Sequence, residues 1–377
     1  MKLVPYIFLT LICFIYLIFM GIIYMKFEKK RVKKEENKIN TLEKKLEEVL
    51  VSQFMNVISG KEVDKGSLEY TNKILRSSSG KVAFNNVLFK LNKERKFSAY
   101  TSKLMKNYET FVLQEIYKYN KKDDIKKAYL LYSLGEYKLC NEEIKKLLIK
   151  ELIRDSLYVR YNALNSISNI GDKETIIEAL RYISKNNIYV NEKMFLEVLD
   201  KSKNDLDISK SIMKNLSEFN TYVQSIIINS FSKNKYALCG EELLNKLSLE
   251  MDREVRISII KYFGCVKIEK AKEKLISLLE SKWWEERALA AKSLNLYYSD
   301  EVEENLKKSI KDSNWHVRLN SALTIIENNC SEKLIEEILL DYDKYANEIL
   351  LYVLKDKSRD LYEKFSEEKN RSMALTC

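Results

Sequence analysis

The chain opens with an unbroken apolar run and continues as a series of amphipathic helix patterns. Residues 3–25 form a stretch of 23 residues without a charge, LVPYIFLTLICFIYLIFMGIIYM. As a helix this run is about 34 Å long, enough to cross a hydrocarbon core of about 30 Å. It is too long for the apolar part of a cleaved signal peptide, and no small-residue cleavage site follows it. The pattern therefore predicts a transmembrane anchor in residues 1–25.

Positive charges follow the apolar run at once. Only Lys2 precedes it, whereas six cations lie in the next nine residues: Lys26, Lys29, Lys30, Arg31, Lys33 and Lys34. The positive-inside rule places this flank, and the body after it, in the cytoplasm. The same cations suit contact with anionic headgroups at the membrane surface. We expect a single-pass protein of the cell membrane with a cytoplasmic body; an exported body is the alternative.

Two helical segments separate the anchor from the rest of the chain. Residues 26–59 have a short heptad pattern of apolar positions that polar residues interrupt, which predicts a membrane-proximal helix rather than a long coiled coil. Residues 60–120 read as an irregular, basic helical segment, with a link at the SSSG of residues 77–80.

A repeat begins at about residue 121 and defines the rest of the body. One register position recurs at steps of 31, 33, 32, 31 and 31 residues, occupied by Val159, Val190, Val223, Val255, Glu286 and Val317. Each unit adds a second amphipathic helix after a short polar turn. Two helices of this length cannot bury their apolar faces alone, so neighbouring units must stack into a solenoid. We assign residues 121–357 to the repeats and residues 358–377 to a C-terminal tail.

The repeat resembles a known family. A V-R pair opens an apolar helix after an acidic residue and a Trp, as in Asp312–Trp315–Val317–Arg318, and this resembles the HEAT-like repeat of phycobilisome-lyase-type proteins. Asn191 and Gln224 stand where the Arg is expected, and Glu286 replaces the Val. The resemblance implies an all-α fold, a HEAT-like α–α solenoid behind the N-terminal transmembrane helix, that serves as a scaffold for protein binding and has no defined reaction.

Composition agrees with an all-helical chain and offers little chemistry. The 377 residues include one Pro, eight Gly, one His and six Cys. Sheet-rich folds use Gly and Pro at many tight turns, so their scarcity favours helices. The Cys residues are scattered, with no pair at metal-ligand or redox spacing. Gly-rich phosphate loops and HExxH motifs are absent. We therefore predict no catalytic, cofactor-binding or metal-binding residues.

Charge is concentrated near the anchor. Residues 51–150 hold 20 Lys/Arg against 11 Asp/Glu, whereas residues 151–377 hold 35 against 38. A basic stripe along the whole body, as nucleic acid would require, is not present. The basic excess instead lies where an anionic inner leaflet would attract it.

Two sets of repeated residues are candidates for function. The first is an arginine column, Arg160, Arg256, Arg287 and Arg318, which is either an anion-binding stripe or a structural ladder with acidic residues of adjacent turns. We favour the ladder because a regularly repeated position usually belongs to the interface between units. The second set, Trp283, Trp284 and Trp315, is a candidate partner-binding site. Trp284 and Trp315 are 31 residues apart, which favours packing, so Trp283 is the better candidate for an exposed contact.

Three functional hypotheses follow. The first is a membrane-anchored scaffold that holds a partner protein at the cytoplasmic face on a surface built from the second helices. The second is an enzyme, because HEAT-like folds include lyases and DNA glycosylases; the near-neutral repeats disfavour a glycosylase. The third is an adaptor in which the basic residues 51–150 bind anionic lipid.

Overall fold

A computed structural model describes residues 4–201, 206–247, 251–328, 330–341 and 343–366. Side chains are not described for residues 4–11, 13, 201 and 206. Every regular element formed by these residues is an α-helix or a 3-10 helix, as the composition predicts. The described chain divides into two compact units, residues 1–172 and 173–377. The division falls inside the predicted repeat region.

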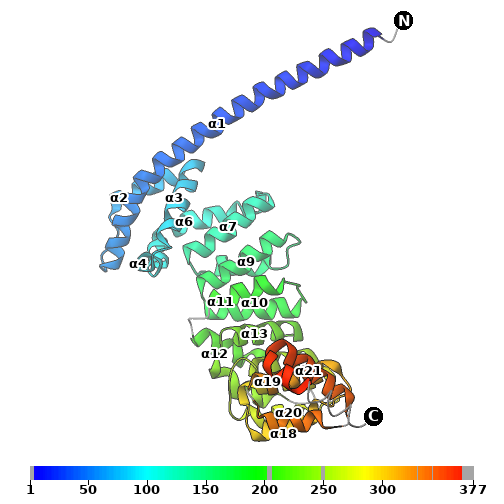
Figure 1. The fold of residues 1–377 in the computed structure, drawn as a ribbon. Coiled ribbons are helices and arrows are strands. Elements are labelled where there is room, and N and C mark those ends of the chain that lie inside the picture. The colour runs from blue at the N-terminus through cyan, green and yellow to red at the C-terminus, as the bar shows by residue number, and fades with distance from the viewer. Residues whose placement is uncertain (1–3, 202–205, 248–250, 329, 342, 367–377) are drawn as a thin grey trace. The chain divides into compact units, whose positions relative to one another are not determined.

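The first unit begins with one long helix. Helix α1 (Val4–Ile58) runs without a break through the apolar run and the predicted membrane-proximal helix, and its N-terminal half projects away from the other helices of this unit (Figure 1). The remaining elements are α2 (Lys65–Leu75), α3 (Ser78–Leu91), α4 (Arg95–Ser98), α5 (Thr101–Met105), η1 (Lys106–Tyr108), α6 (Glu109–Tyr117), η2 (Tyr119–Lys121), α7 (Asp124–Tyr137), α8 (Glu142–Glu151) and α9 (Leu157–Ile170).

Over the part of the chain that the structure describes, no helix is long and apolar enough to cross a membrane. The predicted span, residues 3–25, lies partly outside that part, because Leu3 and the side chains of residues 4–11 and 13 are not described. From Phe14 to Met25, the large apolar side chains of α1 are exposed, apart from half-buried Ile23.

The core of the first unit lies between the C-terminal half of α1 and the helices that follow. Leu46, Leu50 and Phe54 of α1 are fully buried, and α3 packs along this half of the helix. Helices α7 and α9 pack closely because a glycine stands between them. A Cβ atom at Gly135 would lie 2.7 Å from Ser166 Oγ, so only glycine permits this approach.

The second unit is a stack of helix pairs. Its elements are α10 (Lys173–Lys185), α11 (Glu192–Lys201), α12 (Leu206–Lys214), η3 (Leu216–Glu218), α13 (Thr221–Lys233), η4 (Ala237–Cys239), α14 (Gly240–Lys246), α15 (Arg253–Phe263), α16 (Ala271–Leu278), α17 (Trp284–Ser293), η5 (Leu294–Tyr297), α18 (Asp300–Ser309), α19 (Trp315–Glu327), α20 (Glu332–Leu339) and α21 (Lys344–Lys357).

These helices form two layers. The first helix of each pair packs on the first helix of the next, from α11 through α13, α15, α17 and α19 to α21. The second helices α14, α16, α18 and α20 cover one side of this layer. The predicted 31-residue register marks the start of each first helix, where Val223, Val255 and Val317 are fully buried. The second unit is therefore an α-solenoid.

Short polar residues begin the helices of the stack. The side chains of Asn220, Asp252, Ser299, Asn314 and Asp343 each accept a hydrogen bond from a backbone N–H in the first turn of the helix that follows. Such N-caps satisfy donors that have no partner within the helix. Sequence and local geometry thus agree on where these helices begin; α17, which follows Trp283, begins without such a cap.

Candidate functional site

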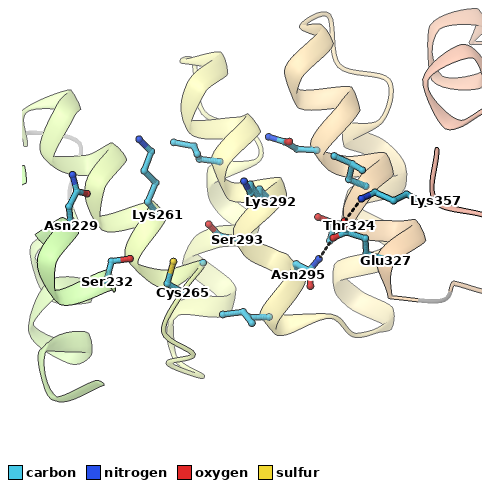
Figure 2. A pocket seen from close by; sticks show the side chains of 15 residues that line it. Asn229, Ser232, Lys261, Cys265, Lys292, Ser293, Asn295, Thr324, Glu327 and Lys357 are labelled. Atoms are coloured by element: carbon cyan, nitrogen blue, oxygen red, sulfur yellow. Dashed lines mark hydrogen bonds and ion pairs between the residues drawn. The ribbon is translucent and has the colours of Figure 1, made fainter. Parts of the chain in front are cut away.

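A groove follows the layer of first helices in the second unit. Its volume is about 610 Å³, and its lining comes from four consecutive first helices, α13, α15, α17 and α19, and from Lys357 at the end of α21 (Figure 2). The sequence pattern predicted a binding surface on the second helices. That surface stays a prediction; the groove itself lies on the first helices, whose side chains line one continuous face from unit to unit.

Hydroxyl and amide groups in the groove join neighbouring first helices. Ser293 Oγ donates to Ile260 O at 3.0 Å, and Thr324 Oγ1 donates to Ala291 O at 2.9 Å. Asn320 Nδ2 reaches Ala288 O at 2.7 Å in the same way. These bonds satisfy buried polar atoms and fix the spacing between α15, α17 and α19. The floor of the groove is therefore preformed.

The charged residues of the groove fall into two groups. Glu327 accepts from Asn295 at 3.0 Å and pairs with Lys357 at 3.5 Å, so its charge is balanced locally (Figure 2). Lys261 and Lys292 are exposed and have no hydrogen-bond or ion-pair partner among the described residues. They occupy equivalent positions on consecutive first helices, 31 residues apart. Two uncompensated cations thus stand side by side in the groove.

Apolar side chains also line the groove. Leu289, Leu296 and Leu323 line the same groove, and Leu296 is exposed. A surface that combines apolar contacts with cations suits an amphipathic segment carrying carboxylates, because it offers both apolar burial and charge complementarity.

Sequence reasoning did not single out Lys261 or Lys292. The signal was present in the repeat, since both residues lie six positions after the column position held by Val255 and Glu286. To interpret that signal, one must know which face of each first helix is covered by its neighbours. The sequence pattern does not show which face stays exposed when a helix packs against others on three sides.

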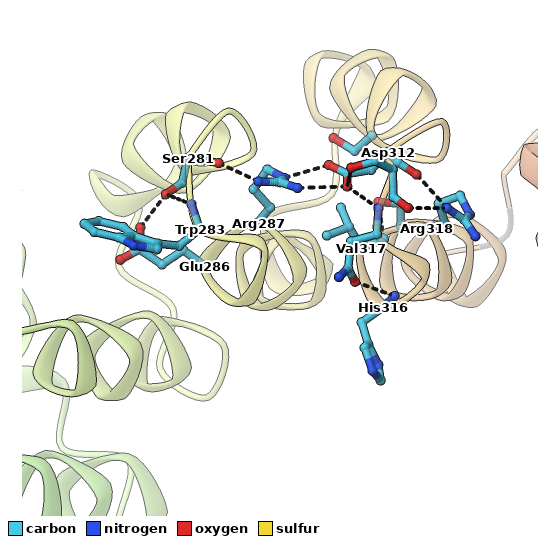
Figure 3. Close-up of polar contacts among 12 residues, drawn as sticks. Ser281, Trp283, Glu286, Arg287, Asp312, His316, Val317 and Arg318 are labelled. Carbon is cyan, nitrogen blue, oxygen red and sulfur yellow. Dashed lines mark hydrogen bonds and ion pairs between the residues drawn. The ribbon is translucent and has the colours of Figure 1, made fainter.

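The arginine column lies apart from the groove lining, near the starts of the first helices. Arg256 of α15 makes two hydrogen bonds to Glu286 of α17, Nε to Oε1 at 2.6 Å and an Nη to Oε2 at 2.8 Å. Their side chains are 1% and 0% exposed. Ser281 Oγ donates a third bond to Glu286, at 2.7 Å (Figure 3). Glu286, which replaces the Val of the repeat, is therefore the partner of the preceding unit's arginine.

This network sets the ionisation of Glu286. Burial acts to raise the pKa of Glu286, but the hydrogen bonds from Arg256 and Ser281 outweigh it, and the pKa lies below its ordinary value. A bidentate pair of hydrogen bonds between a guanidinium and a carboxylate is strong and requires a specific geometry. The pair fixes α15 against α17.

Arg287 repeats this role one unit later with a different partner. It makes two hydrogen bonds to Asp312, in the turn before α19, at 2.6 and 2.9 Å, and a third to Ser281 O at 2.8 Å (Figure 3). Burial acts to raise the pKa of Asp312, but the hydrogen bonds from Arg287 and from the backbone of Asn314 lower it overall. Arg287 thus links the turn before α17, through Ser281, to the turn before α19, through Asp312.

The other two arginines of the column make different contacts. Arg318 donates to Asp312 O and Ser313 O in its own turn and lies 5.1 Å from the centroid of the Tyr345 ring. The Nε of Arg160 is buried without a hydrogen-bond partner among the described residues. The four arginines therefore share a position in the repeat but differ in what they contact.

The exposure of the three tryptophan side chains differs from the prediction that Trp283 is the exposed one. Trp284 and Trp315 are 39% and 46% exposed, whereas Trp283 is half-buried, with the Arg256 guanidinium 5.6 Å and Lys282 Nζ 4.3 Å from its ring centroid. His316 stacks on Trp284 at 5.2 Å and meets Trp315 edge-on at 5.0 Å. The exposed aromatic contact is thus at Trp284 and Trp315.

The remaining candidate residues lie in α1. All six cations after the apolar run are exposed on the projecting part of this helix: Lys26, Lys29, Lys30, Arg31, Lys33 and Lys34. Arg31 pairs with Glu28 at 2.5 Å on the solvent-exposed surface. Such a pair is worth little in water, so it does not prevent these side chains from meeting a surface.

Thiol and metal chemistry is limited in the described residues. Burial raises the pKa of Cys239 to about 11, and burial with the nearby Glu303 raises the pKa of Cys330 to about 11. Both thiols are therefore protonated at neutral pH and are poor nucleophiles. Among the residues described, no three His, Cys, Asp or Glu side chains gather as a metal site would require.

Comparisons with known proteins add little to this picture. No protein-family model and no curated protein matches the chain. A crystal structure of an engineered protein is 15% identical, covers 83% of this chain and 98% of that chain, and has a TM-score of 0.30. Human deoxyhypusine hydroxylase in complex with glycerol is 15% identical over 79% of this chain and 97% of that chain, with a TM-score of 0.27. TM-scores this low carry no argument, so the solenoid is assigned from the chain's own helix pairs.

Proposed function

We propose that the protein is a membrane-tethered, HEAT-like scaffold that holds an acidic segment of a partner protein in the groove of its first helices. The observation that carries this proposal is the pair of exposed lysines, Lys261 and Lys292, which have no partner among the described residues and lie in a preformed groove. Cations with a local carboxylate partner would contribute little to binding. These two are available for a carboxylate brought by another molecule.

The length of the groove supports a protein partner. Neighbouring helices lie about 9 Å apart, so the step from α13 to α21 covers about 35 Å. An extended chain of about ten residues, or a helix of about six turns, spans that distance. A small metabolite spans only part of that length, although the volume of about 610 Å³ lies within the range of small-molecule sites. A linear segment with carboxylates spaced to meet consecutive first helices fits best.

The apolar N-terminal run supports the tether. Residues 3–25 carry no charge, and from Phe14 to Met25 large apolar side chains are exposed around α1. A helix that is apolar on every face requires burial in protein or lipid. The cations from Lys26 to Lys34 support a cytoplasmic body. Tethering raises the local concentration of the scaffold for a partner at the membrane without new contacts.

The groove is tested by charge reversal with a matched control. Lys261→Glu/Lys292→Glu introduces two repulsive charges in the groove, and Lys274→Glu/Lys308→Glu makes the same charge change on the second helices α16 and α18. Proteins captured from a detergent extract by the full chain, by each double variant and by residues 1–59 alone are compared quantitatively. We expect capture of a specific protein to fall at least about tenfold for the groove variant only.

Two outcomes would contradict the proposal. One is that the full chain enriches no protein over residues 1–59. The other is that Lys274→Glu/Lys308→Glu abolishes capture while the groove variant retains it, which would place the binding surface on the second helices.

The tether is tested separately. Phe14→Asp/Ile18→Asp places two charges in the apolar run, each costing about 3 kcal/mol at the centre of a membrane helix. We expect the full chain to resist alkaline extraction from membranes and this variant to be released. Val32→Asp, on the exposed basic part of the same helix, serves as the control and should stay bound. Release of the unsubstituted chain by alkali would exclude the tether.

A further inference from the structure

The first unit exposes large apolar side chains at one end. Tyr117 and Ile125, on either side of the connection from α6 to α7, are 92% and 83% exposed. Tyr158, in the first turn of α9, is 78% exposed, and Ile153 in the connection before it is 53% exposed. Side chains of this kind usually pack inside a protein or meet another surface.

The two connections lie side by side. Buried Tyr119, between Tyr117 and Ile125, has its pKa raised by burial and by the carboxylate of Glu151, at the end of α8. Arg154 Nε lies 3.8 Å from the same carboxylate. Helices α7 and α9 pack along each other, so their N-terminal ends share this end of the unit. The four apolar side chains therefore belong to one surface.

Lysines lie in the sequence beside Tyr117 and Ile125, whereas the exposed Asp155 stands between Ile153 and Tyr158. Lys118 and Lys121 are exposed, and Lys126 is 70% exposed at its side chain and pairs with Asp123 at 2.8 Å. The segment from Tyr117 to Lys127 contains five Lys, at positions 118, 121, 122, 126 and 127, against Asp123 and Asp124. We call Tyr117, Lys118, Lys121, Ile125, Ile153 and Tyr158 the basic-aromatic end.

A buried carboxylate holds this end in place. Glu115 of α6 accepts a hydrogen bond from Lys81 of α3 at 2.6 Å and another from Lys122 at 3.2 Å. Lys127 Nζ lies 5.6 Å from the centroid of the Tyr119 ring. These contacts hold the backbone that carries the basic-aromatic end. Binding to a surface therefore requires little ordering of that backbone, and its cost in backbone conformational entropy is small.

Two contacts connect the basic-aromatic end to α1 through α3, one from Lys81 to Glu115 and one from Ser79 to Glu35. Ser79 Oγ, two residues before Lys81, donates to Glu35 of α1 at 2.5 Å. Farther along, Lys90 of α3 pairs with Glu47 at 2.7 Å, so α3 runs parallel to α1 and its start lies toward the apolar run. Glu35 follows Met25 by only ten residues, about 15 Å of helix. In Figure 1, α3 lies against the lower half of α1, below the projecting part.

We infer that the basic-aromatic end docks on an anionic phospholipid bilayer, next to the point where α1 leaves it. Aromatic and aliphatic side chains that project beside lysines match the interface of a bilayer, where rings lie at headgroup level and cations meet anionic lipids. The cations Lys26 to Lys34 continue this surface along α1. A nucleic acid would not select the aliphatic Ile125 and Ile153. The inference rests on the proposed tether and extends it by giving the first unit a second membrane contact.

The test places a tryptophan in the surface of the full chain. Tyr117→Trp changes a side chain that is almost fully exposed, so the fold is retained. The protein is reconstituted in vesicles of phosphatidylcholine alone, or of phosphatidylcholine with phosphatidylserine, and both carry brominated acyl chains that quench nearby tryptophan. The fluorescence of the chain without the substitution is subtracted because it contains three other tryptophans. We expect strong quenching of the introduced indole only when phosphatidylserine is present.

Two variants provide the controls. Tyr100→Trp lies at the opposite end of the unit, near Lys138 at the end of α7, and its indole should not be quenched in either vesicle. Lys118→Gln/Lys121→Gln, combined with Tyr117→Trp, should lower the ratio of docked to undocked protein about thirtyfold. The inference is overturned if the Tyr117→Trp variant fluoresces equally in the two vesicles, or if the Tyr100→Trp variant is quenched as strongly. Alkaline extraction of the same vesicles reports the tether independently, so failure of one contact is distinguished from failure of the other.

Discussion

The buried pair of Arg256 and Glu286 makes a sharp prediction about the stability of the solenoid. Their side chains are 1% and 0% exposed, and Glu286 receives three hydrogen bonds, two from Arg256 and one from Ser281. Glu286→Val restores the residue that other repeats have at this position but leaves the guanidinium buried without its carboxylate. Removing one partner of a buried ion pair costs about 3–5 kcal/mol.

The charge and the packing contributions can be separated with a double variant. Arg256→Met/Glu286→Val removes both charges and keeps the space filled, so we expect its stability to lie within about 1–2 kcal/mol of the unsubstituted chain. Glu286→Val alone should cost about 3–5 kcal/mol. Lys270→Gln, which breaks an exposed pair with Glu241, is the control and should have no measurable effect.

The tryptophans provide the assay. Trp283, Trp284 and Trp315 are the only tryptophans in the chain, and Trp283 lies against Arg256. Urea unfolding followed by tryptophan fluorescence therefore reports on these repeats, even where a repeat array does not unfold as one unit. The prediction is refuted if Glu286→Val costs less than about 1 kcal/mol, or if the double variant is as unstable as the single one.

Three further predictions concern the first unit, each measured by thermal unfolding followed by circular dichroism. Gly135→Ala places a Cβ 2.7 Å from Ser166 Oγ and should destabilise the α7–α9 contact by about 1–3 kcal/mol, whereas an unchanged unfolding temperature would show that the helices can separate freely. Gly171→Ala, at a φ of +71° after α9, should cost about 1–2 kcal/mol, and a smaller loss would mean that the turn relaxes. Burial acts to raise the pKa of Glu115, but its lysine partners lower it overall. The stabilising effect of the Glu115 carboxylate is therefore present above the ordinary carboxyl pKa and is lost as the pH falls through the lowered pKa. Lys81→Met should weaken this pH dependence of the unfolding temperature, and an identical pH profile would contradict the prediction.

The repeat register was readable from the sequence because it repeats a physical requirement. Val223, Val255 and Val317 are buried at the start of their first helices, and a short polar N-cap precedes each of these three helices. Burial and capping both depend on local residue type, so periodicity alone located the helices. The all-helical class followed from the same pattern and from the scarcity of glycine and proline.

The partners of the arginine column were less accessible to sequence reasoning. Asp252 is the acidic residue that lies four positions before Arg256, but its side chain caps α15, and the guanidinium pairs with Glu286 in the next unit. The spacing of 30 residues between opposite charges, combined with the loss of the repeat's Val at Glu286, was the signal. It was interpreted as a departure from the repeat because a sequence pattern does not show which side chains face each other across two helices.

The lining of the groove and the exposure of the tryptophans could not be predicted from the sequence for a related reason. Periodic spacing identifies equivalent positions but does not say whether those positions face a neighbour or solvent. Trp284 and Trp315 are equivalent and exposed, and Lys261 and Lys292 are equivalent and line the groove. Exposure depends on how consecutive first helices stack, which requires the three-dimensional arrangement.

Crosslinking from inside the groove of the first helices shows whether a partner lies there. Cys265 is exposed in the groove lining, and Cys140 in the first unit is an exposed control. A photoactivated crosslinker is attached to one of these thiols, with the other five Cys of the chain replaced by Ser, and the full chain is irradiated in native membranes. We expect a protein adduct from Cys265 that Lys261→Glu/Lys292→Glu removes and Lys274→Glu/Lys308→Glu preserves. An adduct from Cys140 alone, or one from Cys265 that survives charge reversal in the groove, would contradict the proposed scaffold.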